Sequence, residues 1–306
     1  MTTTAKQVDM ATAISSALDD GDSVYLAGFT HLIPFAAGHE IIRQGYRDLE
    51  VVRATPDLVY DQLIAAGCVR KATFSWAGNP GVGSLRAFRR AVEEGVPNEI
   101  ELEEYTHFGM TARLYAGAVD LPFVPLRTFA GTDLPEHNEN IRPVESPFGD
   151  ETVYAVPPLE PDVAVVRAQR ADAQGNAHVW GITGGHKEAA FAADTVVLSV
   201  EEVVDESVIR SDPNRTLFTD DVVDYVVEEP YGSHPSYAQG YYARDNEAYL
   251  EWDEVSSSHE RVEEWLDEYV YGVDDRREYV ETLPTERLLD LEAGTKYATA
   301  IDMGDY

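Results

Sequence analysis

Apolar positions in the first 130 residues switch repeatedly between helical and strand-like spacing. Val8, Ile14 and Leu18 recur at helical intervals, and Val24–Ala27 is a short apolar run typical of a strand. The same alternation continues and predicts strands at 49–52, 72–76 and 99–103 and helices at 34–44, 58–66, 84–94 and 109–118. Strands this apolar between helices predict a mostly parallel sheet covered on both faces.

The pattern changes in the second half of the chain. Residues 131–150 are rich in turn formers and indicate an excursion, whereas 163–168 and 177–182 predict a hairpin. A helix at 187–193 and a strand at 195–200 follow. Tyr249, Trp252 and Val255, and then Val262, Trp265, Leu266 and Tyr269, predict two amphipathic helices with acidic outer faces. We therefore expect an α/β domain over 1–240 and an acidic helical extension, packed on it, over 241–306.

Charge narrows the choice of partners. The 306 residues contain 56 Asp+Glu against 23 Lys+Arg, a formal net charge of -33, and lysine occurs at only four positions. Nucleic acids and anionic membranes repel such a polyanion, so neither is an expected partner. The chain is 44% hydrophobic, which is too apolar for a disordered acidic chain. An acidic surface nearly free of lysine suits a halophilic protein, because high salt screens its self-repulsion.

Other classes of protein are disfavoured by what the sequence lacks. The single cysteine, Cys68, excludes an internal disulfide and a cysteine-based zinc site. The eight histidines show no metal-ligand spacing, so no metal site is expected. The sequence has no export signal and no long apolar run that would span a membrane. We expect a cytoplasmic protein.

Two glycine-bearing segments lie between predicted strands and helices. They are the turn Gly28–Thr30 and the loop Gly78–Ser84. Free backbone N–H groups at such turns attract carboxylates, phosphates and thioester oxygens, although tight turns without a ligand also explain them. The glycine spacing does not fit a dinucleotide site. Because turns at the carboxyl ends of parallel strands line the ligand crevice, two such turns favour a binding site.

Acid–base candidates end another strand at the same predicted edge. These are Glu103, Glu104 and His107. A carboxylate beside an imidazole suits proton transfer or polarisation of a carbonyl group. A solvated strand end followed by a capping residue, Thr106, explains the same residues without any chemistry.

Several segments, in this order and spacing, together resemble the A (alpha) chain of family I coenzyme A transferases, in particular the glutaconate CoA-transferase type. They are Asp20–Thr30, Pro56–Leu58, Phe74–Ser84, Gly131–Pro135, Ala171–Asn176, Ser199–Asp205 and His234–Tyr237. The resemblance runs from about residue 5 to 270. The long carboxyl-terminal region fits the glutaconate type better than the shorter 3-oxoacid type.

This resemblance implies an open three-layer α/β/α subunit with a helical C-terminal appendage. It also implies a B (beta) subunit, usually in a heterotetramer, whose glutamate in a Ser-Glu-Asn-Gly-like segment attacks the acyl-CoA thioester. No Glu-Asn-Gly string occurs in this chain, so we expect no catalytic nucleophile here. Coenzyme A would enter as a substrate, and no permanently bound cofactor is expected.

The part implied for this chain is the acyl pocket and its hydrogen-bond donors. Backbone N–H groups of the two glycine-bearing segments would bind a substrate carboxylate or a developing oxyanion, with side-chain donors at Ser75 and Asn79. His107 and Glu104 are supporting candidates. The expected substrate-binding residues are Gly28, Phe29, Thr30, Ser75, Gly78, Asn79, Gly81, Val82, Gly83, Ser84 and His107.

Alternatives remain open at this point. Transferases of 3-oxo acids have a Thr-Pro-Gln-Gly-like stretch where this chain has Tyr105–Gly109, and this departure weakens the case for a 3-oxo acid. A branch with the same architecture hydrolyses a cyclic ketone of a CoA thioester, for which Glu103 or Glu104 would be the acidic residue. A sugar-phosphate isomerase or sensor is the third hypothesis, and it would use the arginines after the glycine-rich loop, Arg86, Arg89 and Arg90.

Overall fold

The centre of the molecule is a parallel sheet. A computed structural model describes residues 6–293. The parallel strands lie in the order β12-β10-β8-β1-β2-β3-β4. Their bounds are β1 (Ser23–Leu26), β2 (Leu49–Val52), β3 (Val69–Phe74), β4 (Glu101–Glu104), β8 (Val163–Ala171), β10 (Thr195–Val203) and β12 (Tyr225–Glu228).

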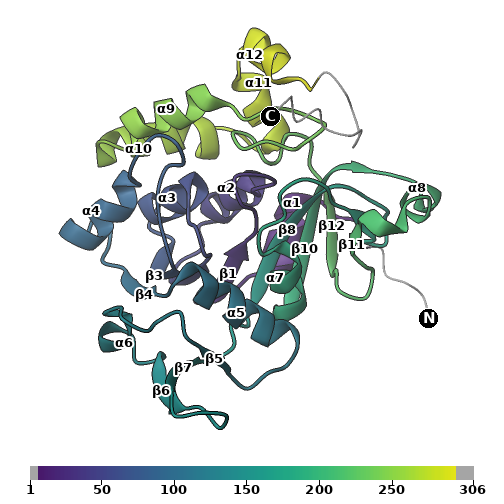
Figure 1. The fold of residues 1–306 in the computed structure, drawn as a ribbon. Helices are drawn as coiled ribbons and strands as arrows, with labels where there is room; N and C mark the ends of the chain where they lie inside the picture. The colour runs from purple at the N-terminus through teal and green to yellow at the C-terminus, as the bar shows by residue number, and fades with distance from the viewer. Residues whose placement is uncertain (1–5, 294–306) are drawn as a thin grey trace, which may run out of the picture.

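Side chains of the strands alternate between two hydrophobic clusters, one on each face of the sheet. Val24 and Leu26 belong to one cluster, and Tyr25 belongs to the other. The first cluster is covered by α1 (Met10–Ala17), α2 (Phe35–Gln44), α3 (Leu58–Ala65) and α4 (Arg86–Glu94), and the second by α5 (His107–Ala118) and α7 (His186–Ala192). Figure 1 shows α2 and α3 on one side of the sheet and α5 and α7 on the other. The predicted α/β class is confirmed.

The second strand of the hairpin is shorter than predicted, because it ends at His178 rather than at residue 182, whereas the excursion has more structure than the sequence indicated. β8 turns back antiparallel into β9 (Ala177–His178), which pairs with β11 (Thr216–Phe218). The excursion contains α6 (Leu134–His137) and a separate antiparallel sheet of β5 (Val124–Leu126), β6 (Arg142–Glu145) and β7 (Thr152–Val156). One short helix, α8 (Glu206–Arg210), and one 3-10 turn (Pro213–Arg215) precede β11.

The carboxyl-terminal helices lie over α2 and α3 (Figure 1). The two expected helices are α9 (Asn246–Val255) and α10 (His259–Leu266), and a π-helical segment (Asp267–Tyr271) continues α10. Their apolar residues Tyr249, Trp252, Val262 and Leu266 join the first hydrophobic cluster. Two helices that the sequence did not indicate follow, α11 (Arg276–Thr282) and α12 (Thr285–Leu291). Residues 294–306 of the expected extension lie outside the described residues.

Candidate active site

Three of the predicted turns meet at the carboxyl edge of the sheet. They follow β1, β3 and β4 and carry Phe29, Ser75 and His107. The Ser75 Oγ and His107 Nδ1 atoms are 3.4 Å apart, and the rings of Phe29 and His107 meet edge to face with centroids 6.1 Å apart. The sequence thus correctly placed these residues at one edge, where ligands bind in open parallel sheets.

The turn after β1 requires glycine at its first position. Gly28 has a φ of +112°, and a Cβ there would lie 2.7 Å from Ile33 Cγ1 and 2.9 Å from the carbonyl oxygen of His31. Thr30 also has a positive φ, +59°, and its carbonyl oxygen accepts a hydrogen bond from the Ser236 hydroxyl at 2.7 Å. The N–H groups of Gly28 and Phe29 have no hydrogen-bond partner within residues 6–293, so neither is engaged by the protein itself.

A buried histidine that the sequence did not single out holds this turn. His31 is fully buried, and burial lowers its pKa to about 4. The neutral ring lies 2.8 Å from the carbonyl oxygen of Ile182 through Nδ1, and its Nε2 accepts from the Gln239 N–H at 3.0 Å. One imidazole therefore ties the turn to two loops that are distant in sequence.

The segment Gly181–Gly185 forms the other wall of the turn. A Cβ on Gly184 would lie 2.9 Å from the Cβ of Phe29, and one on Gly181 would lie 2.9 Å from a ring carbon of His31. These glycines permit the close approach of two backbone segments. Their density in the sequence was a signal that could have pointed to this contact.

His107 begins α5, so the positive end of that helix points to the same edge. Thr106 caps the helix and accepts from the Gly109 N–H at 3.0 Å. The N–H groups of His107 and Phe108 have no partner within the described residues. Ser75 donates its hydroxyl proton to the carbonyl oxygen of Ala54 at 2.5 Å, whereas the sequence predicted that this side chain donates to the substrate. Helix end and imidazole together favour a carboxylate ligand.

The glycine-rich loop Gly78–Ser84 differs from what the sequence predicted. Its N–H groups were expected to face a ligand, but those of Gly78, Asn79, Val82 and Gly83 all donate to backbone carbonyl oxygens, three of them inside the loop. The buried Asn79 side chain donates to the carbonyl oxygen of Tyr249 in α9 at 2.9 Å. This closed loop anchors α9. Within the described residues, only the amides of Gly81 and Ser84 lack a partner in it.

The two candidate glutamates at the end of β4, Glu103 and Glu104, differ in their surroundings. Burial raises the pKa of Glu103, but hydrogen bonds from Lys71 and Tyr105 outweigh this effect, and the net pKa is lowered. Lys71 lies 2.5 Å from it and Asn140 donates to it at 3.1 Å, so Glu103 is an anchored carboxylate. Glu104 is exposed, and its side chain forms no hydrogen bond or ion pair with His107.

The three arginines after the glycine-rich loop do not form a phosphate site. Arg86 pairs with Asp253 at 2.9 Å, Arg89 with Glu93 at 2.8 Å, and Arg90 donates to the carbonyl oxygen of Ser256 at 3.0 Å. All three are engaged with α4 itself or with the segment around α9. The sugar-phosphate hypothesis therefore loses the cations on which it depended.

The fold is that of an open α/β protein with a mostly parallel sheet. The family model described as "Coenzyme A transferase" matches residues 7–229. The chain is 50% identical over 275 residues, which cover 90% of it and 97% of the relative, to the A chain of 3-oxoadipate CoA-transferase from Pseudomonas knackmussii. It therefore belongs to the coenzyme A transferases of family I, as their A (alpha) chain, which confirms the resemblance found in the sequence.

Two further comparisons bear on the chemistry. The crystal structure of glutaconate coenzyme A-transferase from Acidaminococcus fermentans has a TM-score of 0.90 and 30% identity, covering 96% of this chain and 98% of that chain. A cholesterol ring-cleaving hydrolase IpdA subunit of Rhodococcus jostii is 29% identical over 88% of this chain and 93% of its own length. Greater similarity to the transferases favours CoA transfer over ring hydrolysis.

Proposed function

We propose that this chain provides the acyl-binding half of a CoA-transferase whose acid substrate is a dicarboxylic 3-oxo acid such as 3-oxoadipate. The observation that carries the proposal is the 50% identity, over nearly the full length of both chains, to a relative named for that substrate. Because that relative acts on a 3-oxo acid by its name, the departure at Tyr105–Gly109 is no reason to exclude one.

Catalysis would be shared with a B subunit. A glutamate of that partner attacks the thioester carbonyl of acyl-CoA, and a mixed anhydride and free CoA thiolate form. The thiolate then attacks the glutamyl carbonyl, which releases the acid and leaves a glutamyl-CoA thioester. The acceptor carboxylate reverses these steps and collects CoA. The free N–H groups of Gly28 and Phe29 would stabilise each oxyanion, while His107 and the end of α5 hold a carboxylate.

Exposed apolar residues at this edge support a partner chain. Phe29 is 38% exposed, Trp76 51% and Phe108 61%. Tyr115 and Phe191, on α5 and α7, are also exposed. Large apolar side chains gathered around a polar site are typical of a protein interface. We propose that the B subunit covers them and completes the cleft, in a heterotetramer.

The test is reconstitution with the companion chain that copurifies from the native host. CoA transfer between an acyl-CoA and 3-oxoadipate is expected only in the mixture, and each chain alone should be inactive. Full transfer activity from this chain alone would contradict the shared site. Transfer to other acids but not to 3-oxoadipate would contradict the proposed substrate while leaving the shared site intact.

His107→Ala should lower kcat about 10- to 100-fold in the reconstituted complex, because the imidazole lies beside Ser75 at the site edge. The measurement is kcat and KM for the acid substrate. His137→Ala in α6, also an exposed histidine, is the matched control and should leave both constants unchanged. Unaltered kinetics in His107→Ala would reduce that residue to a packing role.

We also propose a cytoplasm of high salt as the habitat, from the net charge of -33. The Debye length falls from about 10 Å at 0.1 M salt to about 3 Å at 1 M, so salt screens the repulsion between surface carboxylates. The midpoint of thermal unfolding should rise as KCl is added, as measured by circular dichroism. Equal midpoints in dilute and concentrated KCl would contradict a salt requirement.

No helix among residues 6–293 is long and apolar enough to cross a membrane.

A further inference from the structure

A cavity lies between the C-terminal helices and the face formed by α2 and α3. Its volume is about 620 Å³, which is within the usual range for small-molecule sites. Its lining includes none of the residues assigned to the active site. Aromatic side chains come from four different segments: Trp252 in α9, Trp265 in α10, Tyr269 in the π-helical segment and Tyr279 in α11.

The aromatic rings form a continuous wall. Trp252 and Trp265 meet at 76° with centroids 5.1 Å apart, and Trp265 and Tyr269 are 5.4 Å apart. Tyr269 and Tyr279 meet at 73°. Aromatic faces that line a cavity attract cations. The ring of Tyr279 already carries the guanidinium group of Arg276, so the rings left for a ligand are those of Trp252, Trp265 and Tyr269.

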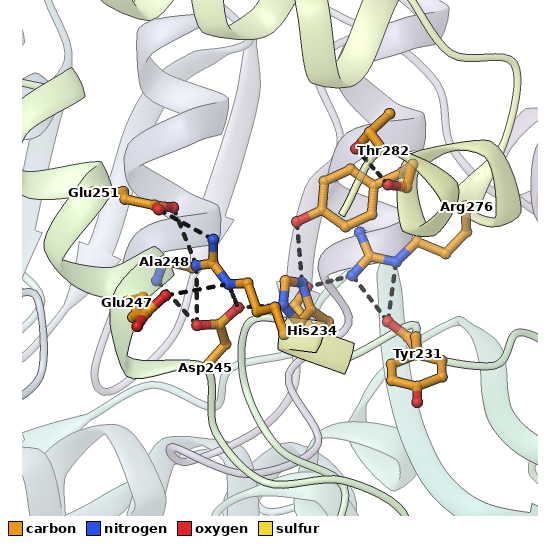
Figure 2. A network of polar contacts seen from close by, with 10 residues as sticks. Tyr231, His234, Asp245, Glu247, Ala248, Glu251, Arg276 and Thr282 are labelled. Carbon is orange, nitrogen blue, oxygen red and sulfur yellow. Dashed lines mark hydrogen bonds and ion pairs between the residues drawn. The ribbon is translucent and has the colours of Figure 1, made fainter. Parts of the chain in front are cut away.

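A hydrogen-bonded network fixes one end of the cavity, and Figure 2 shows it from close by. His234 is fully buried, with Nε2 2.7 Å from Asp245 Oδ2 and Nδ1 3.0 Å from the Tyr279 hydroxyl. Burial raises the pKa of Asp245, but hydrogen bonds from His234 and Arg287 outweigh it, and the net pKa is well below the usual value. Burial lowers the pKa of His234. A neutral imidazole thus donates to an ionised carboxylate, and Tyr279 donates to the imidazole.

Arg276 completes this network from the other side, as Figure 2 also shows. Its guanidinium donates to the carbonyl oxygen of Tyr231 at 3.0 and 2.9 Å and stacks on the ring of Tyr279 at 4.1 Å. Arg287 is likewise engaged, with Asp245 at 2.6 Å and Glu251 at 3.0 Å. Both guanidinium groups therefore bind partners within the protein rather than an anionic ligand.

One side-chain amide in the cavity lining has no protein partner for its N–H groups. Gln62 is only 2% exposed and lines the cavity. Its Oε1 lies 3.1 Å from His39 Nε2, but its Nε2 has no hydrogen-bond partner within residues 6–293. Its two protons can be satisfied by an acceptor atom of a molecule inside the cavity.

The mouth of the cavity is acidic. The lining holds the carboxylates of Glu251, Glu254, Glu264 and Glu268 against the guanidinium groups of Arg261 and Arg287. Among the described residues, Glu264 and Glu268 have no ion pair. This charge repels acyl-CoA and free carboxylic acids. The described residues also hold no group of three or more His, Cys, Asp or Glu suited to a metal ion.

We propose that this cavity binds a small organic ammonium ion that carries a hydrogen-bond acceptor. The aromatic wall and the mouth carboxylates attract the ammonium group, and the Gln62 amide donates to the acceptor. The site is separate from the CoA-transfer site, and its test does not depend on the transferase reaction.

Choline and its neutral isostere 3,3-dimethyl-1-butanol are the matched probes, because they differ in charge but hardly in shape. The full-length chain, purified in the complex that it forms, is titrated with each at constant KCl while its tryptophan fluorescence and heat of binding are followed. Choline should bind about tenfold more tightly than the alcohol. Equal affinities, or no choline binding up to about 100 mM, would overturn the proposal.

Variants locate the bound choline. Trp265→Leu should weaken choline binding about tenfold. The double variant E264Q/E268Q changes only exposed residues and should weaken it several-fold and reduce its salt dependence. Phe148→Leu, at a 97% exposed residue outside the cavity, is the control and should bind as the parent does. Choline affinity that is unchanged in E264Q/E268Q, which needs no repacking to fold, would refute this site.

Discussion

Gly28→Ala should lower kcat for CoA transfer at least about 100-fold, the cost typical of losing an oxyanion donor. The new methyl group would lie 2.7 Å from Ile33 Cγ1 and 2.9 Å from the carbonyl oxygen of His31, at a φ of +112°. The backbone contact cannot be relieved by a side-chain rotation, so the turn must move. Its movement carries the N–H groups of Gly28 and Phe29 away from the thioester oxygen. Steady-state kinetics of the reconstituted complex measure the loss.

Gly21→Ala is the control for Gly28→Ala, because it introduces backbone strain without displacing the turn after β1. Gly21 also has a positive φ, +91°, but a Cβ there would meet no atom within 4 Å, and it precedes β1 at the opposite edge of the sheet. This control should lose about 1 kcal/mol of stability and keep its kcat. A Gly28→Ala enzyme that keeps kcat within about twofold would show that these amides are not the oxyanion donors.

The inner strands of the parallel sheet could be predicted because both of their faces are buried. Strands such as Val24–Ala27 are then apolar throughout and differ clearly from the helices between them. The small antiparallel sheet could not be predicted in this way. β6 reads Arg-Pro-Val-Glu, and none of its residues is buried, so it has no hydrophobic pattern. Its pairing with β7 depends on a partner that the local sequence does not specify.

The residues at the site edge could be predicted from the sequence because of the topology of a parallel sheet. Turns that follow parallel strands share one edge, so Phe29, Ser75 and His107 could be grouped before any distance was known. Glycine content, in contrast, shows only that a loop has conformational freedom. It does not show where the amides point. The Gly78–Ser84 loop turned its amides inward because Asn79 bonds to Tyr249, 170 residues further along the chain.

The structural role of His31 could not be predicted from the local sequence either. Two of its hydrogen-bond partners, Ile182 and Gln239, are 151 and 208 residues away in sequence. No local pattern distinguishes a histidine that joins three loops from one at the surface of a turn. Its burial, however, has a consequence that can be measured without any substrate.

Acid should unfold this protein through its buried histidines. Burial lowers the pKa of His31 to about 4 and that of His186 to about 3. Below the ordinary pKa of 6.5 the unfolded chain binds protons that the folded chain excludes, so stability falls as the pH falls towards these values. At 1.36 kcal/mol per pKa unit, His31 alone contributes a loss of about 3 kcal/mol between pH 6.5 and 4.

His31→Gln tests this contribution, because glutamine keeps a donor and an acceptor but does not titrate. Unfolding by guanidinium chloride between pH 7.5 and 4.5, in which salt screens the surface carboxylates, gives the free energy of unfolding. The variant should be less stable than the parent at pH 7.5 and should lose less stability on acidification, so the two curves converge. His137→Gln, at the exposed α6, should follow the parent throughout. Parallel curves for His31→Gln and the parent would mean that His31 is not held neutral, and the hydrogen bond that it accepts from Gln239 could then not be what fixes the turn.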